Sequence, residues 1–317
     1  MTRSMAVIGR VIETAEINGA DFIQQARVDC GPSGTWRGVV GKDLEVGTLV
    51  TVFLQDALLP PDPRWAFMEK HKWRVRMARF KGVPSECLII PGAPDMPVGI
   101  DMTEALGVVK YEKPIPAALA GDMAGSFPSF IPKTDEANFQ TVPELVERLA
   151  DGNWYAAEKA DGTSCTVWND DAGMHVCSRN WELLETNAAG AKNAYWQAAR
   201  KYDLTRIPQG FALQFEVVGP GIQSNPMGLR ELEARAFSLY DTTTHTFASV
   251  ETLRSLAEAL GIPLARQIEA PQRLHSDDEL RALAEIRYAN GKHGEGVVIR
   301  ANDSSWSFKV INLKYEN

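Results

Sequence analysis

The sequence predicts an α+β protein of two domains: a small all-β domain at residues 1–113 and a larger domain of helices and antiparallel strands at residues 134–317. Three observations support this fold class. The chain has 317 residues, a length that favours two domains over one. Its first part carries short apolar or alternating runs between turns. Its second part alternates such runs with helical patterns that have recognisable start and stop signals.

Composition restricts the compartment and the kind of partner. Hydrophobic residues make up 44% of the chain and charged residues 23%, as in ordinary soluble globular proteins. The net charge of -8 disfavours a protein that coats nucleic acid with its whole surface, so phosphate binding needs a local basic patch. The four cysteines form no CxxC pair, and we find neither a signal peptide nor an apolar run of about 20 residues. We therefore expect a cytoplasmic protein without membrane contact.

The first domain is predicted from strand patterns that are separated by turns. Strand patterns cover residues 6–12, 35–40 and 49–54, and a mixed apolar stretch covers residues 22–28. Short segments rich in Gly, Asn and Pro separate them. Strands at this spacing are typical of a small barrel or sandwich.

A basic segment follows these strands and is unusual in an acidic chain. Residues 73–78 predict a strand with cationic side chains on one face and apolar side chains on the other. The cations of the whole segment are Lys70, Lys72, Arg74, Arg76, Arg79 and Lys81. One interpretation is a half-buried strand with a solvated cationic face. The other is a face that follows phosphates, because a small barrel with basic and aromatic side chains suits a single strand or a duplex backbone.

The second domain follows a stretch rich in Pro, Gly and Ala, in which we place an interdomain linker at residues 114–133. Helical patterns cover residues 142–149, 193–202, 250–260 and 276–289. Their ends are marked by Pro143 in a first turn, by a capping box of Ser276 with Glu279, and by Gly261 as a C-cap. Strand patterns lie between them at residues 174–178, 211–218, 235–240, 296–300 and 307–311.

One turn of the second domain carries a lysine with two interpretations. An apolar run leads to Glu-Lys-Ala-Asp-Gly at residues 158–162, and an alternating run at residues 164–168 follows, which predicts strand, tight turn, strand. The ordinary interpretation of Lys159 is a solvated turn lysine. The alternative is a nucleophilic amine placed where a phosphate can reach it. The short motif alone does not decide between them.

Further polar residues lie on or beside the apolar strands of this domain. Five of them follow, interrupt or begin predicted strands: Arg179, Glu216, Tyr240, Glu295 and Lys309. A charged group inside an apolar strand is costly to bury without a partner. Structural ion pairs, such as Glu216 with Arg300 or Glu295 with Lys309, would satisfy some of them. A common pocket explains all of them at once.

The order of these motifs resembles the covalent nucleotidyltransferases, the superfamily of DNA ligases, RNA ligases and mRNA capping enzymes. The motifs that carry the resemblance are Glu-Lys-x-Asp-Gly, Ser-Arg-Asn at residues 178–180, the strand with Glu216, Tyr-Asp, Glu-Gly-Val-Val-Ile-Arg and Phe-Lys-Val. The chain is most similar to the Deinococcus-type nick-sealing RNA ligases, through residues 125–136 and 218–226. This resemblance implies an ATP-grasp-like nucleotidyltransferase domain of antiparallel sheets with flanking helices, preceded by a small all-β OB-fold barrel.

The same resemblance implies an ATP-dependent RNA ligase that seals 3′-OH/5′-phosphate nicks. Lys159 would attack the α-phosphorus of ATP, carry AMP and pass it to the 5′-phosphate, after which a 3′-hydroxyl seals the strand. The amine must be neutral to attack, against an ordinary pKa of about 10.4, and a metal ion and Lys309 are the expected cations that lower it. The implied partner is a nicked duplex with an RNA 3′-OH end, held by the basic segment. We expect a monomer.

The resemblance also implies a role for each site residue. The catalytic residues would be Lys159, Glu216, Glu295 and Lys309. Mg²⁺ or Mn²⁺, directly or through water, would be held by Asp161, Glu216, Glu295 and Asp56. ATP, with its base, ribose and phosphates, would be contacted by Glu158, Gly162, Arg179, Gln140, Tyr240 and Lys314. Within that set, Tyr240 would stack on adenine and Arg179 would bind a phosphate.

Two departures from the family pattern and two rival functions stay open at this point. Asn138 stands where the family usually has an arginine, and Lys314 lies in a shorter C-terminal segment than relatives have. A GTP-dependent capping-type nucleotidyltransferase is disfavoured because the small barrel precedes the transferase domain. A catalytically decayed nucleic-acid-binding protein is disfavoured because every charged motif residue is present. Covalent labelling by ATP or by GTP distinguishes these alternatives.

Overall fold

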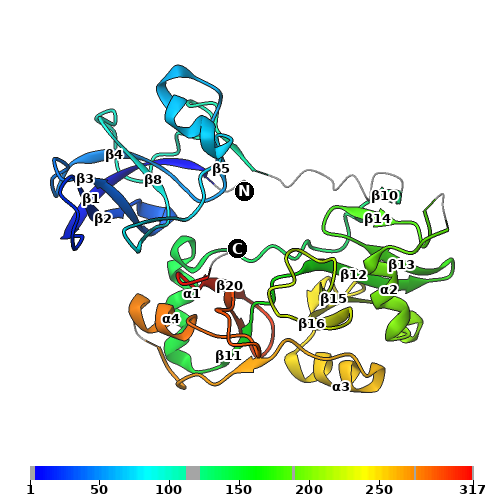
Figure 1. Cartoon of the computed structure of the whole chain (residues 1–317). Coiled ribbons are helices and arrows are strands. Elements are labelled where there is room, and N and C mark those ends of the chain that lie inside the picture. Colours follow the sequence, from blue (N-terminus) through cyan, green and yellow to red (C-terminus); the bar gives the residue numbers. More distant parts are fainter. Residues whose placement is uncertain (1–3, 112–121, 188–189, 275, 316–317) are drawn as a thin grey trace. The chain divides into compact units, whose positions relative to one another are not determined.

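The computed structural model describes residues 4–111, 122–187, 190–274 and 276–315 (Figure 1). The chain divides into two compact units, one of residues 1–114 with 140–143 and one of residues 115–139 with 144–317. Of the linker predicted at residues 114–133, the part up to residue 121 lies outside the described residues, and Met123–Ser126 forms strand β10. Among the described residues, no helix is long and apolar enough to cross a membrane.

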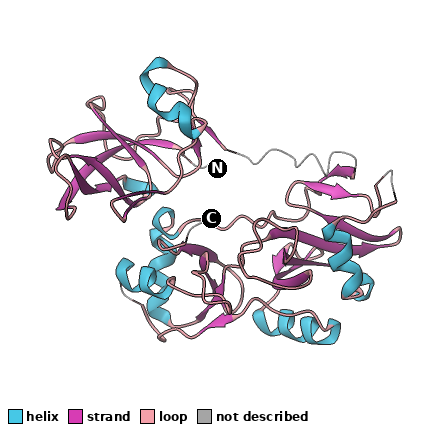
Figure 2. Ribbon diagram, in the orientation of Figure 1, coloured by secondary structure: helices cyan, strands magenta, loops and turns pink. Residues whose placement is uncertain are grey.

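A five-stranded antiparallel sheet organises the first unit (Figures 1 and 2). In the spatial order β3-β2-β1-β4-β8, its strands are β3 (Thr35–Gly41), β2 (Ile23–Asp29), β1 (Ala6–Glu16), β4 (Leu49–Phe53) and β8 (Leu88–Pro91). The three strand patterns predicted for this region are confirmed. A bulge between Val11 and Glu13 lets the long strand β1 bend, and the sheet forms half of a barrel.

Short strand pairs and an apolar core complete the first unit. The pairs are β5 (Ala57–Leu58) with β9 (Val109–Lys110) and β6 (Ala78–Phe80) with β7 (Val83–Ser85). Trp36, Val50 and Val52 are fully buried in the core of the sheet. A Cβ on Gly9 of β1 would come within 2.5 Å of the Val28 side chain, so glycine permits this close packing of neighbouring strands.

The basic segment does not form the predicted strand. Its first residues end a 3-10 helix at Pro63–His71, which the side chain of Asp62 caps. Lys72 and Trp73 then take left-handed conformations, with φ of 53° and 60°. Arg74 then forms an isolated bridge with Leu58, and a regular strand begins only at Ala78. The alternation of charged and apolar side chains was misleading because two consecutive left-handed residues break an extended run.

A seven-stranded antiparallel sheet forms the larger part of the second unit. In spatial order its strands are β10, β14 (Trp181–Leu183), β13 (Gly173–Cys177), β12 (Thr163–Asp170), β15 (Phe211–Val218), β16 (Glu233–Asp241) and β17 (Thr246–Phe247). Helix α2 (Ala194–Lys201) packs on β13 and β15, and helix α3 (Val250–Leu260) packs on β16 (Figure 1). The strand predicted at residues 211–218 and the helix predicted at residues 250–260 are confirmed at both ends.

A second antiparallel sheet of four strands completes this unit. In spatial order its strands are β18 (Gln267–Ile268), β11 (Trp154–Glu158), β19 (Gly296–Ala301) and β20 (Ser307–Ile311). Helix α4 (Asp277–Leu283) lies against β20 (Figure 1). The helix predicted at residues 142–149 is divided into α1 (Pro143–Glu147) and a 3-10 turn at Arg148–Asp151.

Helix α4 begins where the sequence predicts and ends six residues earlier than predicted. The hydroxyl of Ser276 accepts from the N–H of Glu279 at 3.3 Å, so the predicted cap is confirmed. After Leu283 the chain turns into a hairpin at residues 286–294, in which the N–H of Gly294 donates to the carbonyl of Ile286 at 3.0 Å. Backbone groups that pair across a hairpin cannot also continue a helix.

Side chains of opposite character occupy the two faces of the seven-stranded sheet. Leu213, Phe215 and Val217 of β15 are fully buried in the core that α2 and α3 cover. Gln214 and Glu216 alternate with them and therefore point to the other face. Because that face carries polar groups inside the protein, it needs polar or charged partners.

Candidate active site

Lys159 lies just after strand β11, held against the start of β19. Its backbone N–H donates to the carbonyl of Gly296 at 2.8 Å. Its Nζ lies 2.7 Å from Oε1 of Glu295, and the two side chains are only 24% and 21% exposed. The lysine is therefore not a solvated turn residue, but one half of a largely buried ion pair.

Three carboxyl groups act on this amine. Burial alone lowers the pKa of Lys159, but the charges of Glu295, Glu216 and Asp161 and the hydrogen bond to Glu295 together outweigh it, so the pKa lies above its ordinary value. Burial raises the pKa of Glu216 to about 8; the ammonium of Lys159 opposes this rise, and the other two carboxylates add to it. The site thus has more acidic groups than the ammonium of Lys159 alone can neutralise, and a further cation would stabilise it.

Lys309 lies on the same face of the four-stranded sheet. Its cross-strand partner is Val298 of β19, which lies opposite Ala157 of β11. Side chains directly opposite each other in antiparallel strands share a face, and so do residues two apart along one strand. Ala157, Val298 and Lys309 form one cross-strand row. Lys159 lies two residues after Ala157, so Lys159 and Lys309 lie in neighbouring rows on the same face. The backbone N–H of Lys309 donates to the carbonyl of Ala137 at 2.8 Å.

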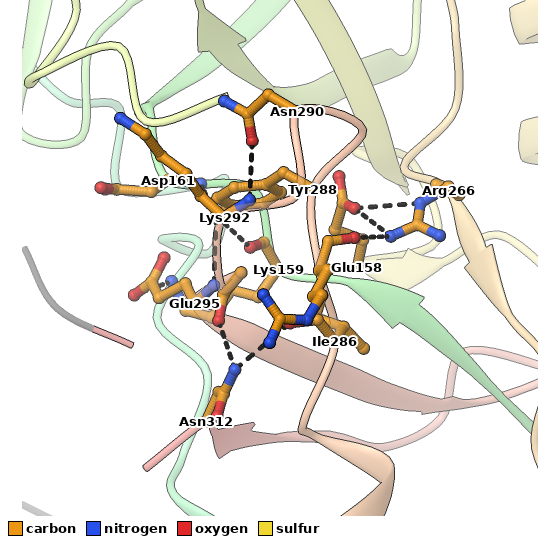
Figure 3. A network of polar contacts seen from close by, with 12 residues as sticks. Glu158, Lys159, Asp161, Arg266, Ile286, Tyr288, Asn290, Lys292, Glu295 and Asn312 are labelled. Carbon is orange, nitrogen blue, oxygen red and sulfur yellow. Dashed lines mark hydrogen bonds and ion pairs between the residues drawn. The ribbon is translucent and has the colours of Figure 1, made fainter. Parts of the chain in front are cut away.

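A tyrosine that the sequence did not single out connects these elements (Figure 3). The hydroxyl of Tyr288 donates to the carbonyl of Lys159 at 3.3 Å. It accepts from the N–H of Asp161 at 3.2 Å and from the N–H of Glu295 at 3.1 Å. Tyr288 is 3% exposed, and burial raises the pKa of its phenol. No local pattern could have revealed the link to Lys159 and Asp161, because these two partners lie 129 and 127 residues away in sequence.

The neighbours of Lys159 in its motif have partners of their own. The buried carboxylate of Glu158 accepts two hydrogen bonds from the guanidinium of Arg266, at 2.6 Å and 3.0 Å. A carboxylate oxygen of Asp161 accepts from the hydroxyl of Tyr315. A Cβ on Gly162 would lie 2.3 Å from a backbone oxygen of β15, so only glycine fits at this position. The motif is therefore tightly packed on both sides of the lysine.

A cavity of about 170 Å³ with a mixed polar and apolar lining lies between the two sheets of this unit. Its walls include Gln214, Phe237, Ser238, Arg300 and Ser307, with residues 132–136. The guanidinium of Arg300 pairs with Glu136 at 2.7 Å and lies 5.3 Å from the centre of the Phe237 ring. The sequence suggested ion pairs of Glu216 with Arg300 and of Glu295 with Lys309. In the structure, Arg300 pairs with Glu136 and Glu295 pairs with Lys159.

Three predicted nucleotide contacts have other partners in the second unit. Arg179 pairs with Asp135 at 2.7 Å, and both side chains are 46% exposed. Lys314 pairs with Glu285 at 2.5 Å on the surface. Tyr240 is buried against Phe247, with ring centres 5.2 Å apart, and does not line the cavity.

Two predicted site residues belong to the first unit. The side-chain amide of Gln140 is buried and donates to Oε1 of Glu86 at 2.9 Å. The carboxylate of Asp56 accepts from Arg74 at 2.6 Å and 3.1 Å, and that guanidinium stacks 3.8 Å from the centre of the Tyr111 ring. Among the cations of the basic segment, the exposed ones are Lys70, Lys72, Arg76 and Lys81.

The described residues contain no group of three or more His, Cys, Asp or Glu side chains arranged to hold a metal ion. Mg²⁺ does not need such a group, because this ion usually keeps several waters and uses one or two carboxylates together with substrate phosphates. The carboxylates around Lys159 therefore fit Mg²⁺. Glu216 suits such a role. Burial and nearby acids hold its pKa high, and a bound cation would favour its charged form.

The family of RNA ligases matches residues 152–315, the part of the chain that contains Lys159, Glu216, Glu295 and Lys309. This chain belongs to the RNA ligase family. The ligase is also similar to solved structures of a Naegleria gruberi RNA ligase. An apo variant is 30% identical with a TM-score of 0.83, and the match covers 98% of this chain and 96% of that one.

Two further variants of the Naegleria ligase match as well. One, solved with AMP and Mn, is 30% identical over 98% of this chain and 97% of that one, with a TM-score of 0.83. Another, solved with ATP and Mn, has the same identity, coverage and TM-score. No curated protein sequence matches the ligase.

Proposed function

We propose that this ligase uses ATP to join RNA ends through an AMP group carried on Lys159. The observation that carries the proposal is the largely buried ion pair of Lys159 with Glu295, on which Glu216 and Asp161 also act. The Naegleria ligase has been solved with ATP and Mn and with AMP and Mn, which supports ATP as the nucleotide and Mg²⁺ or Mn²⁺ as the metal.

The first step would form a nitrogen–phosphorus bond and break an oxygen–phosphorus bond. The amine of Lys159 attacks the α-phosphorus of ATP, and pyrophosphate leaves with the electron pair of the broken bond. The ammonium loses one proton before the attack and a second as the phosphoramidate forms. Glu295, at 2.7 Å, is placed to accept the first proton. The positive charge of Lys309 on the same face favours the neutral amine and stabilises the phosphate.

The carboxylates next to Lys159 are the residues that would hold a metal ion. When bound, Mg²⁺ or Mn²⁺ supplies positive charge that lowers the pKa of the amine and stabilises the leaving phosphates. Glu216 and Glu295, with Asp161, would bind the ion directly or through water. We leave Asp56 out of this set, because its carboxylate is already paired with Arg74.

The cavity between the two sheets suits the base of ATP. The Phe237 ring offers a stacking surface in its wall. Beside it, the hydroxyl of Ser238 donates to Oε1 of Gln214 at 2.6 Å, and Nε2 of Gln214 donates to the carbonyl of Pro132 at 2.8 Å, so these two side chains shape the wall. We therefore assign the stacking role to Phe237, because Tyr240 is buried and does not line the cavity.

The later steps would transfer AMP to RNA and seal it. The phosphoramidate bond breaks as a 5′-phosphate takes the AMP, and a 3′-hydroxyl then attacks the adenylylated end and releases AMP. We propose a nicked duplex with an RNA 3′-OH end as the substrate of a monomer, as in the Deinococcus-type ligases that the sequence resembles. The exposed cations of the basic segment suit duplex phosphates, and the half-barrel of the first unit is consistent with an OB-fold.

Covalent labelling tests this proposal. The wild-type ligase incubated with α-labelled ATP and Mg²⁺ or Mn²⁺ should become labelled, and Lys159→Ala should not. Lys192→Ala is a matched control, because its ammonium pairs with Glu185 at 2.9 Å away from the motif; it should label as the wild type does. Label retained by Lys159→Ala contradicts the assignment. Labelling by GTP alone would indicate a capping-type enzyme, and no labelling at all would indicate a decayed site.

A sealing assay tests the substrate. Nicked duplexes that differ only in the sugar on each side of the nick should be sealed when the 3′-OH end is RNA, whatever sugar carries the 5′-phosphate. Equal sealing of a nick with a DNA 3′-OH end contradicts the proposed RNA requirement.

A further inference from the structure

We propose that Tyr288 is a positioning residue for nucleotidyl transfer: its hydroxyl holds the backbone on both sides of the Lys159–Glu295 pair, so that amine and carboxylate meet in one geometry. This inference rests on the proposed function and adds to it a residue outside every motif that the sequence revealed. Tyr288 touches neither the reacting amine nor the carboxylate oxygens in the described contacts. It acts through the backbone that carries them.

The hydroxyl of Tyr288 is fully used by three backbone groups. A phenol offers one donor and two acceptor positions. The donor goes to the carbonyl of Lys159 at 3.3 Å, and the acceptors take the N–H groups of Asp161 at 3.2 Å and Glu295 at 3.1 Å. The tyrosine therefore ties the turn after β11 to the residue before β19 at the point where the two charged side chains leave the backbone (Figure 3).

Strand pairing alone does not fix this region. The ladder between β11 and β19 ends with Glu158 opposite Val297. Beyond it, one backbone hydrogen bond continues, from the N–H of Lys159 to the carbonyl of Gly296. The tyrosine hydroxyl supplies the next link, so its loss should affect the geometry of the ion pair more than the stability of the sheet.

A hydrogen-bonded hairpin carries the tyrosine. Across residues 286–294, the N–H of Tyr288 donates to the carbonyl of Lys292 at 2.9 Å. The fully buried side chain of Asn312, just after β20, donates to the carbonyls of Ile286 at 3.3 Å and Gly294 at 2.9 Å (Figure 3). The contacts that place the hydroxyl thus come from the protein itself, which is what a positioning role requires.

Tyr288→Phe removes only this oxygen and leaves the ring. Single-turnover labelling of Lys159 should be measured over a range of ATP concentrations. We expect the maximal rate to fall about 10- to 100-fold, because three backbone groups, one buried and two partly buried, lose their partner; the half-saturating ATP concentration should be unchanged. The matched control is Tyr202→Phe, a half-buried tyrosine whose hydroxyl accepts from the N–H of Ala234 at 3.5 Å, outside the motif; its maximal rate should equal that of the wild type.

A wild-type maximal rate in Tyr288→Phe overturns the inference, and so does a rise in half-saturating ATP at an unchanged maximal rate. If Tyr288→Phe does not fold, Gly294→Ala takes its place. A Cβ there would lie 3.2 Å from the Tyr288 ring and 2.9 Å from the Ile286 side chain. This variant therefore keeps the Tyr288 hydroxyl but shifts its position. The same outcomes then apply to its maximal rate. A wild-type ligase that takes no label overturns the proposed function itself.

Discussion

Replacing Arg300 with methionine should destabilise the second unit, because the carboxylate of Glu136 is then buried without its cation. The two side chains are 10% and 14% exposed, and the atoms of the ion pair are 2.7 Å apart. Removing one partner of a buried ion pair costs about 3–5 kcal/mol. Glu136 keeps one hydrogen bond, from the hydroxyl of Ser307 at 2.5 Å, so we expect about 3 kcal/mol, the lower end of that range.

Differential scanning calorimetry of the whole chain measures this loss. At roughly 2–4 °C per kcal/mol for a unit of this size, the unfolding midpoint should fall by about 6–12 °C. The double variant Glu136→Gln/Arg300→Met should recover most of the loss, because no charge is left buried without a partner.

Arg179→Met provides the matched control. Its ion pair with Asp135 has the same 2.7 Å distance, but both side chains are 46% exposed, so its loss should cost less than about 1 kcal/mol. Equal shifts of the midpoint in Arg179→Met and Arg300→Met would refute the reasoning, since burial and not distance is expected to set the cost. A double variant as unstable as the single one would refute it as well.

Three further predictions concern pH, packing and metal. Burial lowers the pKa of His175, but the hydrogen bonds to Glu182 and Asp170 outweigh burial, so the pKa of the folded protein lies above the ordinary value. The charged imidazole therefore stabilises the fold fully below the unfolded pKa of about 6.5, and this stabilisation is lost as the pH rises through the folded pKa. His175→Gln should therefore lower the unfolding midpoint more at pH 5.5 (roughly one unit below that value) than at pH 9 (well above it); an equal effect at both would contradict this. Gly162→Ala should cost about 1–3 kcal/mol because its Cβ meets backbone, whereas Gly125→Ala, with its nearest contact at 3.9 Å, should be close to neutral in the same melts. Chelation of divalent metal should abolish labelling by ATP, and added Mg²⁺ or Mn²⁺ should restore it; labelling that survives chelation would exclude the metal role.

Local patterns predicted those elements whose ends are decided by neighbouring residues. The helix at Val250–Leu260 and the strand at Phe211–Val218 were predicted to the residue, because periodicity, caps and turns all lie within the segment. The basic segment was predicted wrongly because Lys72 and Trp73 adopt left-handed backbone, which the pattern of side chains does not encode. The helix predicted to continue past Leu283 failed because hairpin pairing competes for the same backbone groups.

The charged residues of the candidate site were also accessible from the sequence. Charged side chains inside or beside apolar strands are costly unless they meet, so Lys159, Glu216, Glu295 and Lys309 stood out from their surroundings. The structure brings the first three into electrostatic contact and sets the fourth on the same face. The chain by itself therefore determined its fold class and the chemical groups of its site.

Only the tertiary structure decided how those groups are held. Tyr288 reaches the carbonyl of Lys159 across 129 residues of sequence, and Arg266 reaches Glu158 across 108. Phe237 lines the cavity while Tyr240, on the same strand, is buried outside it. Such contacts depend on which strands pair and how two sheets face each other. They are long-range consequences of packing, and no local spacing of residue types contains them.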